Sequence, residues 1–182
     1  MIDLVFAHPY PDRSRANRRL LEAVRDLSGV EVRSLYDRYP DFAIDVDAEQ
    51  QALTGASVLV WQCPIYWYSV PALLKLWFDK VLAHGWAYGP GTRALKGKRC
   101  LWVATTGGGP EAYRQGGVHE RPFADFIAPV EETALFCGMR WEAPLIVHSA
   151  RVASDTDLEA AAAGYRDRLA ALLALPGEEA HG

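Results

Sequence analysis

Residues 2–17 are IDLVFAHPYPDRSRAN, a run that is apolar except for Asp3, followed by a polar loop with two prolines and the start of a helical pattern. The run from Ile2 to Ala7 indicates a β-strand covered on both faces, because its apolar residues are nearly continuous rather than alternating. From Ser14 to Leu27, apolar residues recur at helical spacing. A strand, a short loop and a helix in this order form the first half of a βαβ unit.

The same alternation continues along the chain. Apolar runs predict four more strands, at Val30 to Leu35, Ser57 to Cys63, Arg99 to Thr105 and Ala143 to His148. Helical spacing predicts three more helices, at Val70 to Ala83, Phe123 to Gly138 and Thr156 to Leu175. Together these elements predict an α/β, flavodoxin-like three-layer sandwich with a five-stranded parallel sheet in the order 2-1-3-4-5.

The length of 182 residues predicts one domain over residues 1–176, with a tail at 177–182. Two connecting segments, Tyr36 to Ala48 and Gly85 to Gly97, are predicted to be long loops, and their aromatic content suggests a functional role. Hydrophobic residues make up 50% of the chain and charged residues 23%, a composition that excludes a disordered protein. The three cysteines stand far apart, so neither a zinc site nor a disulfide framework is predicted.

Charge and terminal sequence predict the surroundings of the protein. A net charge of −4 argues against binding to nucleic acid, which needs clustered basic surface. The first residues lack the basic and long apolar segments of a signal peptide, and no apolar run has the length of a membrane helix. We therefore expect a cytoplasmic protein, and peripheral attachment to the inner membrane through a partner stays open.

In a parallel sheet of this kind, ligands bind beyond the carboxyl ends of the strands. The loop after the first strand, His8 to Asn17, offers imidazole, hydroxyl, guanidinium and amide donors in front of a helix N-terminus, a setting that favours phosphate. The alternative is that Ser14 only caps the helix and His8 only satisfies backbone groups. Neither GxGxxG nor GxxxxGK[ST] is present, which argues against a dinucleotide fingerprint and a Walker loop.

Two further loops follow the third and fourth strands. Cys63 to Pro71 carries three consecutive aromatic residues between prolines, suited to lie along a flat ring or to plug the end of the sheet. Thr105 to Gly109 contains three glycines, which let backbone N–H groups approach a ligand or merely form a flexible turn. Beyond them, Tyr113 and His119 are candidates to donate hydrogen bonds or protons, although a lone His is more commonly structural.

At these residues the chain resembles the flavodoxin-2 family of NAD(P)H:quinone oxidoreductases. The motifs that carry the resemblance are Ala7-His-Pro9, Ser14 to Asn17, Pro64-Ile-Tyr-Trp-Tyr-Ser-Val-Pro71, Lys75-Leu-Trp-Phe-Asp79, Gly85-Trp-Ala-Tyr-Gly89 and Thr105-Thr-Gly-Gly108. Within the family, the chain most resembles the ancillary subunits of glutathione-gated potassium efflux systems. The segments that carry this resemblance are Ala7-His-Pro-Tyr-Pro11, Arg33-Ser-Leu-Tyr36, Tyr39-Pro-Asp-Phe42, Leu73-Leu-Lys-Leu-Trp77 and His84-Gly-Trp-Ala-Tyr-Gly89.

The resemblance implies FMN as cofactor, with FAD as the alternative, and a homodimer in which the partner helps to close each site. FMN is favoured because the chain lacks the long C-terminal extension of the larger FAD-containing relatives. The implied contacts are His8, Ser14, Arg15, Ala16, Asn17, Ile65, Tyr66, Trp67, Tyr68, Thr105, Thr106, Gly107 and Gly108. Tyr113 and His119 fall where the larger quinone reductases of the family place a catalytic pair, in a segment that departs from the ancillary subunits.

The leading hypothesis is an FMN-dependent, two-electron NAD(P)H:quinone oxidoreductase acting on quinones or related electrophiles, with the redox chemistry supplied by the cofactor. The alternative is a regulatory subunit of a potassium efflux transporter, in which the flavin is structural or sensory. A pure electron carrier is disfavoured, because the aromatic loops, Tyr113 and His119 suggest a substrate cavity. NADH and NADPH stay equal alternatives as electron donor.

Overall fold

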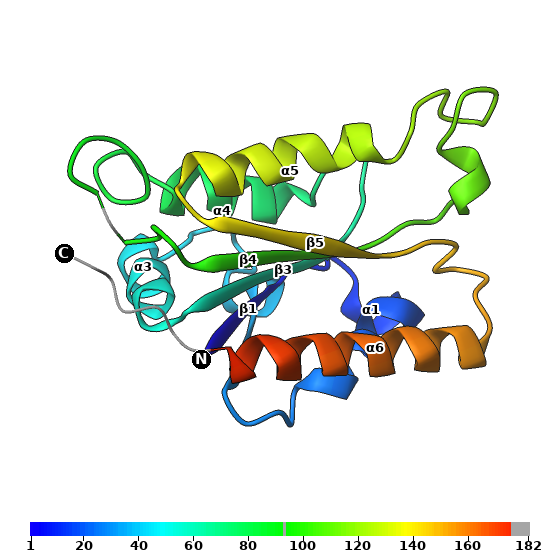
Figure 1. Cartoon of the computed structure of the whole chain (residues 1–182), viewed down its shortest axis with the longest axis horizontal. Coiled ribbons are helices and arrows are strands. Elements are labelled where there is room, and N and C mark those ends of the chain that lie inside the picture. The colour runs from blue at the N-terminus through cyan, green and yellow to red at the C-terminus, as the bar shows by residue number, and fades with distance from the viewer. Residues whose placement is uncertain (93, 176–182) are drawn as a thin grey trace.

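The computed structural model describes residues 1–92 and 94–175, and its centre is a parallel sheet with the strand order β2-β1-β3-β4-β5 (Figure 1). The strands are β1 (Ile2–Phe6), β2 (Val30–Ser34), β3 (Val58–Pro64), β4 (Arg99–Thr105) and β5 (Arg140–Val147). Strand β1 pairs in parallel with both β2 and β3, so the order reverses at β1 and β3. The predicted fold and strand order are confirmed, while the predicted tail and residue 176 lie outside the described residues.

Helices cover both faces of the sheet (Figure 1). On one face, α1 (Arg15–Val24) and α6 (Asp155–Ala174) pack over a cluster that includes Leu4, Val60 and Leu101. On the other face lie α2 (Leu35–Arg38), α3 (Val46–Gly55), α4 (Ala72–Val81) and α5 (Ala124–Phe136). Two short 3-10 turns, Pro11–Arg13 and Pro110–Ala112, follow β1 and β4. Among the described residues, no helix is both long enough and apolar enough to cross a membrane.

The segment between β2 and β3 differs from its prediction. Residues 36–48 were expected to be a loop, but the structure forms α2 and starts α3 within them. Helix α3 buries only Glu49 and Leu53, so it lacks the broad apolar stripe by which the other helices were predicted. Its one sequence signal is Asp45, whose side chain accepts a hydrogen bond from the Ala48 N–H at 3.0 Å.

A buried ionic network ties α3 to the sheet. The guanidinium of Arg33 on β2 pairs with Asp3 on β1, at 2.8 Å between Nε and Oδ1, and with Glu49. Glu49 also accepts hydrogen bonds from the Tyr39 hydroxyl at 2.8 Å and the Trp77 indole N–H at 2.7 Å. Burial raises the pKa of Asp3, and the Arg33 hydrogen bond opposes that shift. Three of the motifs that carry the family resemblance therefore contribute a residue to this buried network, namely Arg33, Tyr39 and Trp77.

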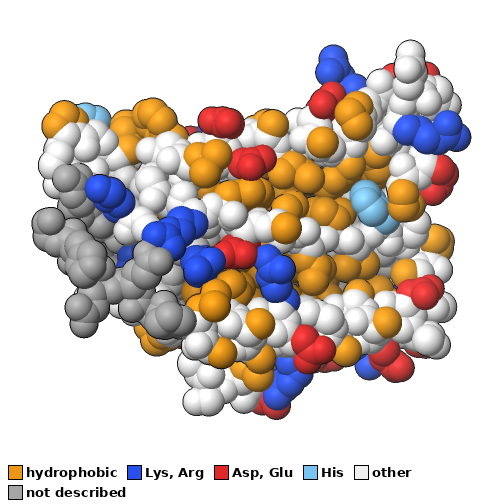
Figure 2. Space-filling model, viewed as in Figure 1, with side chains coloured by type: hydrophobic (Ala, Val, Ile, Leu, Met, Phe, Trp, Pro, Cys, Tyr) orange, Lys and Arg blue, Asp and Glu red, His pale blue; other side chains and the backbone are white. Residues whose placement is uncertain are grey.

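Strand β5 is the least covered strand of the sheet. Every residue of β1 and β3 is buried, whereas every residue of β5 is exposed or half-buried. Figure 2 shows a hydrophobic surface in this region, between α5 and α6. A parallel strand normally has both faces covered, so β5, at the edge of the sheet, is unusually exposed.

Candidate functional site

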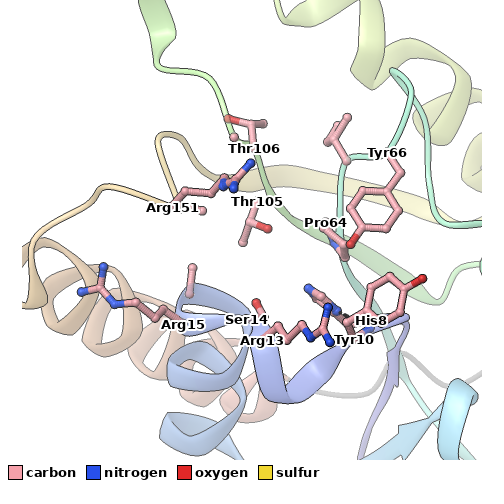
Figure 3. A pocket seen from close by; sticks show the side chains of 14 residues that line it. His8, Tyr10, Arg13, Ser14, Arg15, Pro64, Tyr66, Thr105, Thr106 and Arg151 are labelled. Atoms are coloured by element: carbon pink, nitrogen blue, oxygen red, sulfur yellow. Dashed lines mark hydrogen bonds between the residues drawn. The ribbon is translucent and has the colours of Figure 1, made fainter.

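A cavity of about 510 Å³ opens beyond the carboxyl ends of β1, β3 and β4, next to the point where the strand order reverses (Figure 3). Its lining residues are His8, Tyr10, Arg13, Ser14, Arg15, Ala16, Pro64, Ile65, Tyr66, Thr105, Thr106, Gly107, Ala150 and Arg151. All three loops predicted from the sequence contribute. A fourth loop, after β5, also contributes and was not predicted.

The N-terminus of α1 forms one end of the cavity. Ser14 is the N-cap, and its Oγ accepts a hydrogen bond from the Asn17 N–H at 3.2 Å. The N–H groups of Arg15 and Ala16 belong to the first turn, which has no acceptor within its own helix. Both residues line the cavity, so these amides and the helix dipole favour an anion there. Ser14 therefore caps the helix and also lines the cavity, so the two interpretations of this residue are compatible.

Asn17 joins the N-terminal end of α1 to the sheet by hydrogen bonds. Its side chain is buried and donates from Nδ2 to the Thr105 Oγ1 at 2.7 Å, while its backbone carbonyl accepts from the Gln62 Nε2 at 3.0 Å. Gln62 in turn accepts a hydrogen bond from the buried Tyr165 hydroxyl at 3.2 Å. Asn17 therefore does not line the cavity but joins α1 to β3 and β4, and Gln62 extends this network to α6.

Three arginines surround the helix end, and they differ in what they contact. Arg15 donates to Asp155 at 2.8 Å, so most of its charge is compensated within the chain. Arg13 stacks on the Tyr10 ring at 5.8 Å from its centroid. Arg151 reaches the cavity from the β5–α6 loop, on the side of Thr105 and Thr106 (Figure 3). The cavity therefore has three guanidinium groups among its lining residues, which favour an anionic ligand.

His8 shapes the first loop. Its Nδ1 accepts a hydrogen bond from the Tyr10 N–H at 3.0 Å, so the neutral ring carries its proton on Nε2 and can donate from that atom. The ring is buried, lies near Phe6 at 6.4 Å and meets Tyr66 edge-on at 6.3 Å. Burial lowers the pKa of His8, which keeps the ring neutral at pH 7.

The lowered pKa of His8 predicts a pH dependence of stability. Because its folded pKa lies below 6.5, acidification from that value downward protonates His8 in the unfolded chain first, and the free energy of unfolding falls. We expect His8→Gln to lose part of this slope, since glutamine does not titrate. Urea unfolding of both proteins from about pH 7.5 to pH 5 measures the slopes; equal slopes would contradict the prediction.

The second loop is a tight hairpin turn. Tyr66 and Ser69 exchange backbone hydrogen bonds of 3.0 and 3.1 Å, and the two residues between them have positive φ values of 48° and 65°. A left-handed conformation is costly for Trp67 and Tyr68, both of which have a Cβ and a bulky ring. The turn leaves 92% of Trp67 exposed, outside the cavity. Of the four predicted residues here, only Ile65 and Tyr66 line the cavity.

The third loop contributes Thr105, Thr106 and Gly107 to the cavity, whereas Gly108 lies behind it. A Cβ on Gly108 would lie 3.3 Å from the Ala112 Cβ and 3.5 Å from the Tyr113 Cε2. Gly108 is therefore needed for the close packing of the following segment. Gly108 does not line the cavity, and its contact with the cofactor stays a prediction.

Tyr113 and His119 come together, as predicted for a pair. Their rings stack at 4.6 Å between centroids and 29° between planes. Tyr68 meets the His119 ring edge-on at 5.4 Å and stacks on Phe126. The pair does not line the cavity itself, but its position beside Gly108 makes it a neighbour of the third loop. Among the described residues, the buried Nδ1 of His119 has no hydrogen-bond partner.

The fourth loop follows β5 and was missed. The Ala150 N–H donates to the Thr106 carbonyl at 2.9 Å, and the Ser149 N–H donates to the Gly108 carbonyl at 3.0 Å. His148 Nδ1 lies 3.0 Å from the Thr106 Oγ1. The rule that ligands bind at the carboxyl ends of strands applies equally to β5 and could have identified this loop. By contrast, the aromatic residues of the segment predicted as a loop at 85–97, Trp86 and Tyr88, precede β4 and so lie at the opposite end of the sheet from the cavity.

The family model for the flavodoxin-like fold of the flavodoxin-2 family matches residues 2–169. Among solved structures, general stress protein 14 of Treponema denticola, in complex with FMN, is 36% identical, with a TM-score of 0.89 and coverage of 94% of this chain and 98% of that chain. A thermophilic tryptophan halogenase from Streptomycin violaceusniger is 37% identical, with a TM-score of 0.87 and coverage of 93% and 98%.

A third structure, an NADPH-quinone reductase from P. pentosaceus, is 27% identical, with a TM-score of 0.84 and coverage of 92% of this chain and 96% of that chain. The names of these proteins differ, so their shared similarity identifies a family rather than one reaction. Together with the strand order and the position of the cavity, the match over nearly the whole chain shows that this protein belongs to the flavodoxin-2 family of flavodoxin-like proteins.

Proposed function

We propose that this protein is an FMN-dependent NAD(P)H:quinone oxidoreductase. The observation that carries the proposal is one cavity that has a cationic helix N-terminus at one end and aromatic and glycine-containing loops along its walls. Support also comes from a relative of 36% identity that is named as a complex with FMN, and from one of 27% identity that is named an NADPH-quinone reductase.

The residues present fit this cofactor chemically. The N–H groups of Arg15 and Ala16, the Ser14 hydroxyl and the arginines supply donors for a phosphate. Ile65 and Tyr66 offer an apolar and an aromatic surface for a flat ring system. A cavity of about 510 Å³ lies within the size range of small-molecule and cofactor sites.

When bound, FMN would accept a hydride from NAD(P)H and pass two electrons to a quinone. The protein would orient the reactants and move protons. Tyr113 and His119 are suited to donate hydrogen bonds or protons to oxygen atoms that gain electrons, because both carry polar hydrogens beside the third loop. Tyr68 packs against His119 and so links this pair to the hairpin turn of the second loop.

We further propose that two copies of the chain form a homodimer through β5 and α5. Every residue of β5 is exposed or half-buried, and Phe136 at the end of α5 is 71% exposed. A second copy would cover this hydrophobic surface, which Figure 2 shows between α5 and α6. Trp67 is 92% exposed and is next to Tyr68, which stacks on Phe126 of α5, so the same association would bring new residues near the Trp67 ring.

Phe136→Glu should weaken the homodimer, because it places a charge in an apolar interface. Sedimentation velocity should give a dimer for the unchanged protein and a larger monomer fraction for the variant. Val152→Glu is the control, since Val152 is 80% exposed on the β5–α6 loop and belongs to neither β5 nor α5. A protein that sediments as a monomer at micromolar concentration would contradict the proposed dimer.

Steady-state assays test the proposed reaction. We expect oxidation of NADH or NADPH to depend on added quinone, with equal amounts of donor and quinone consumed, as a two-electron transfer requires. Comparing the two donors settles which one the protein prefers. Donor oxidation that is absent with every quinone, by a protein that binds FMN, would refute the enzymatic proposal. Co-purification with a potassium efflux transporter would then favour the regulatory alternative.

A further inference from the structure

We propose that Arg151 binds the terminal phosphate of the flavin and that the β5–α6 loop is built to hold it there. This inference rests on the proposed function. Arg151 lines the cavity, and its Cδ lies 3.8 Å from the position of a Cβ on Gly107. It therefore stands across the cavity from Ser14 and Arg13, which approach from the side of α1 (Figure 3).

The charges at the site support this role. A phosphate monoester carries about two negative charges at neutral pH. Arg15 already pairs with Asp155 at 2.8 Å, so part of its charge is balanced within the chain. No carboxylate within residues 1–92 and 94–175 pairs with Arg13 or Arg151, and the only contact found for Arg13 is with the Tyr10 ring. These two guanidinium groups and the helix dipole therefore match a dianion.

The backbone of the β5–α6 loop is strained in a way that positions Arg151. Ser149 has a φ of 55°, in the left-handed region that residues with a Cβ rarely adopt. The loop is held in place by the Ser149 N–H on the Gly108 carbonyl and the Ala150 N–H on the Thr106 carbonyl. Such strain persists where surrounding bonds enforce it and often marks a functional loop. The third loop thus holds in place the β5–α6 loop, which carries Arg151.

Riboflavin lacks the phosphate of FMN, so it separates a phosphate ligand from a residue that supports the loop. In full-length protein stripped of flavin, Arg151→Gln should raise the Kd for FMN about tenfold and change the Kd for riboflavin by less than about twofold. The Kd of Arg151→Lys for FMN should lie between the values of the unchanged protein and Arg151→Gln, because lysine keeps the charge and loses the planar donor pair. Arg25→Gln, at the exposed far end of α1, removes the same charge and should leave both values unchanged.

Quenching of flavin fluorescence measures these constants. Equal losses for FMN and riboflavin would overturn the inference, because Arg151 would then support the loop rather than the phosphate. An unchanged Kd for FMN in Arg151→Gln would overturn it too. If the unchanged protein bound neither flavin, the proposed function itself would fail, which is a different result from failure of Arg151 alone.

Discussion

Arg33→Met is expected to lower the free energy of unfolding by about 3–5 kcal/mol, because it leaves two buried carboxylates without their cation. Arg33, Asp3 and Glu49 are each at most 2% exposed. Methionine fills much of the space of the arginine stem but cannot pair with either carboxylate. Equilibrium unfolding in urea at pH 7 measures the loss.

Two comparisons make the result specific. Arg18→Met removes an exposed arginine that pairs with Glu22 at 3.8 Å, and it should cost less than about 1 kcal/mol. In Arg33→Met, the loss relative to the unchanged protein should shrink as the pH falls, because burial raises the pKa of Asp3 and protonation removes its unpaired charge. A loss no larger than that of Arg18→Met would show that the network contributes little.

The second large effect concerns catalysis. Changing Tyr113 to Phe and His119 to Ala together should lower the rate constant for flavin reduction by NAD(P)H about 10²-fold, since both groups that donate hydrogen bonds or protons are removed. The Kd for FMN should change little, because neither side chain lines the cavity. Anaerobic stopped-flow absorbance at saturating donor measures the rate constant.

The chain offers a matched control for this double variant. Tyr88 and His84 also form an aromatic pair, with ring centroids 5.5 Å apart, in the loop that precedes β4. Tyr88→Phe with His84→Ala makes the same chemical changes at the opposite end of the sheet and should leave flavin reduction unchanged. If both double variants reduce flavin at the original rate, Tyr113 and His119 have no role in the reaction.

The strands and the larger helices could be predicted because their apolar residues face a core on one or two sides. Strand β5 began three residues earlier than predicted, at Arg140 rather than Ala143, because Arg140 to Glu142 are polar or bulky residues at an edge. Helix α3 could not be predicted from periodicity, since Glu49 is buried through its ion pair with Arg33 rather than through apolar contact. Charge pairing across distant segments leaves no local pattern in a sequence.

The site was predicted in outline and differs in detail. The loops after β1, β3 and β4 meet at one cavity, as their places after parallel strands imply. Trp67 and Tyr68 do not line that cavity; both lie in the tight turn between Tyr66 and Ser69. Arg151 was missed because a single arginine after the last strand carries no motif, and only the fold brings it to the third loop.

We infer that the cavity beyond the strands holds FMN that NAD(P)H can reduce. The most direct measurement combines mass spectrometry of the cofactor released from the purified protein with anaerobic absorbance spectra recorded as NADH or NADPH is added. We predict a yellow protein that releases FMN in an equimolar amount and bleaches with at least one of the two donors. A colourless protein that binds no added FMN, or a bound flavin that neither donor bleaches, would contradict the account.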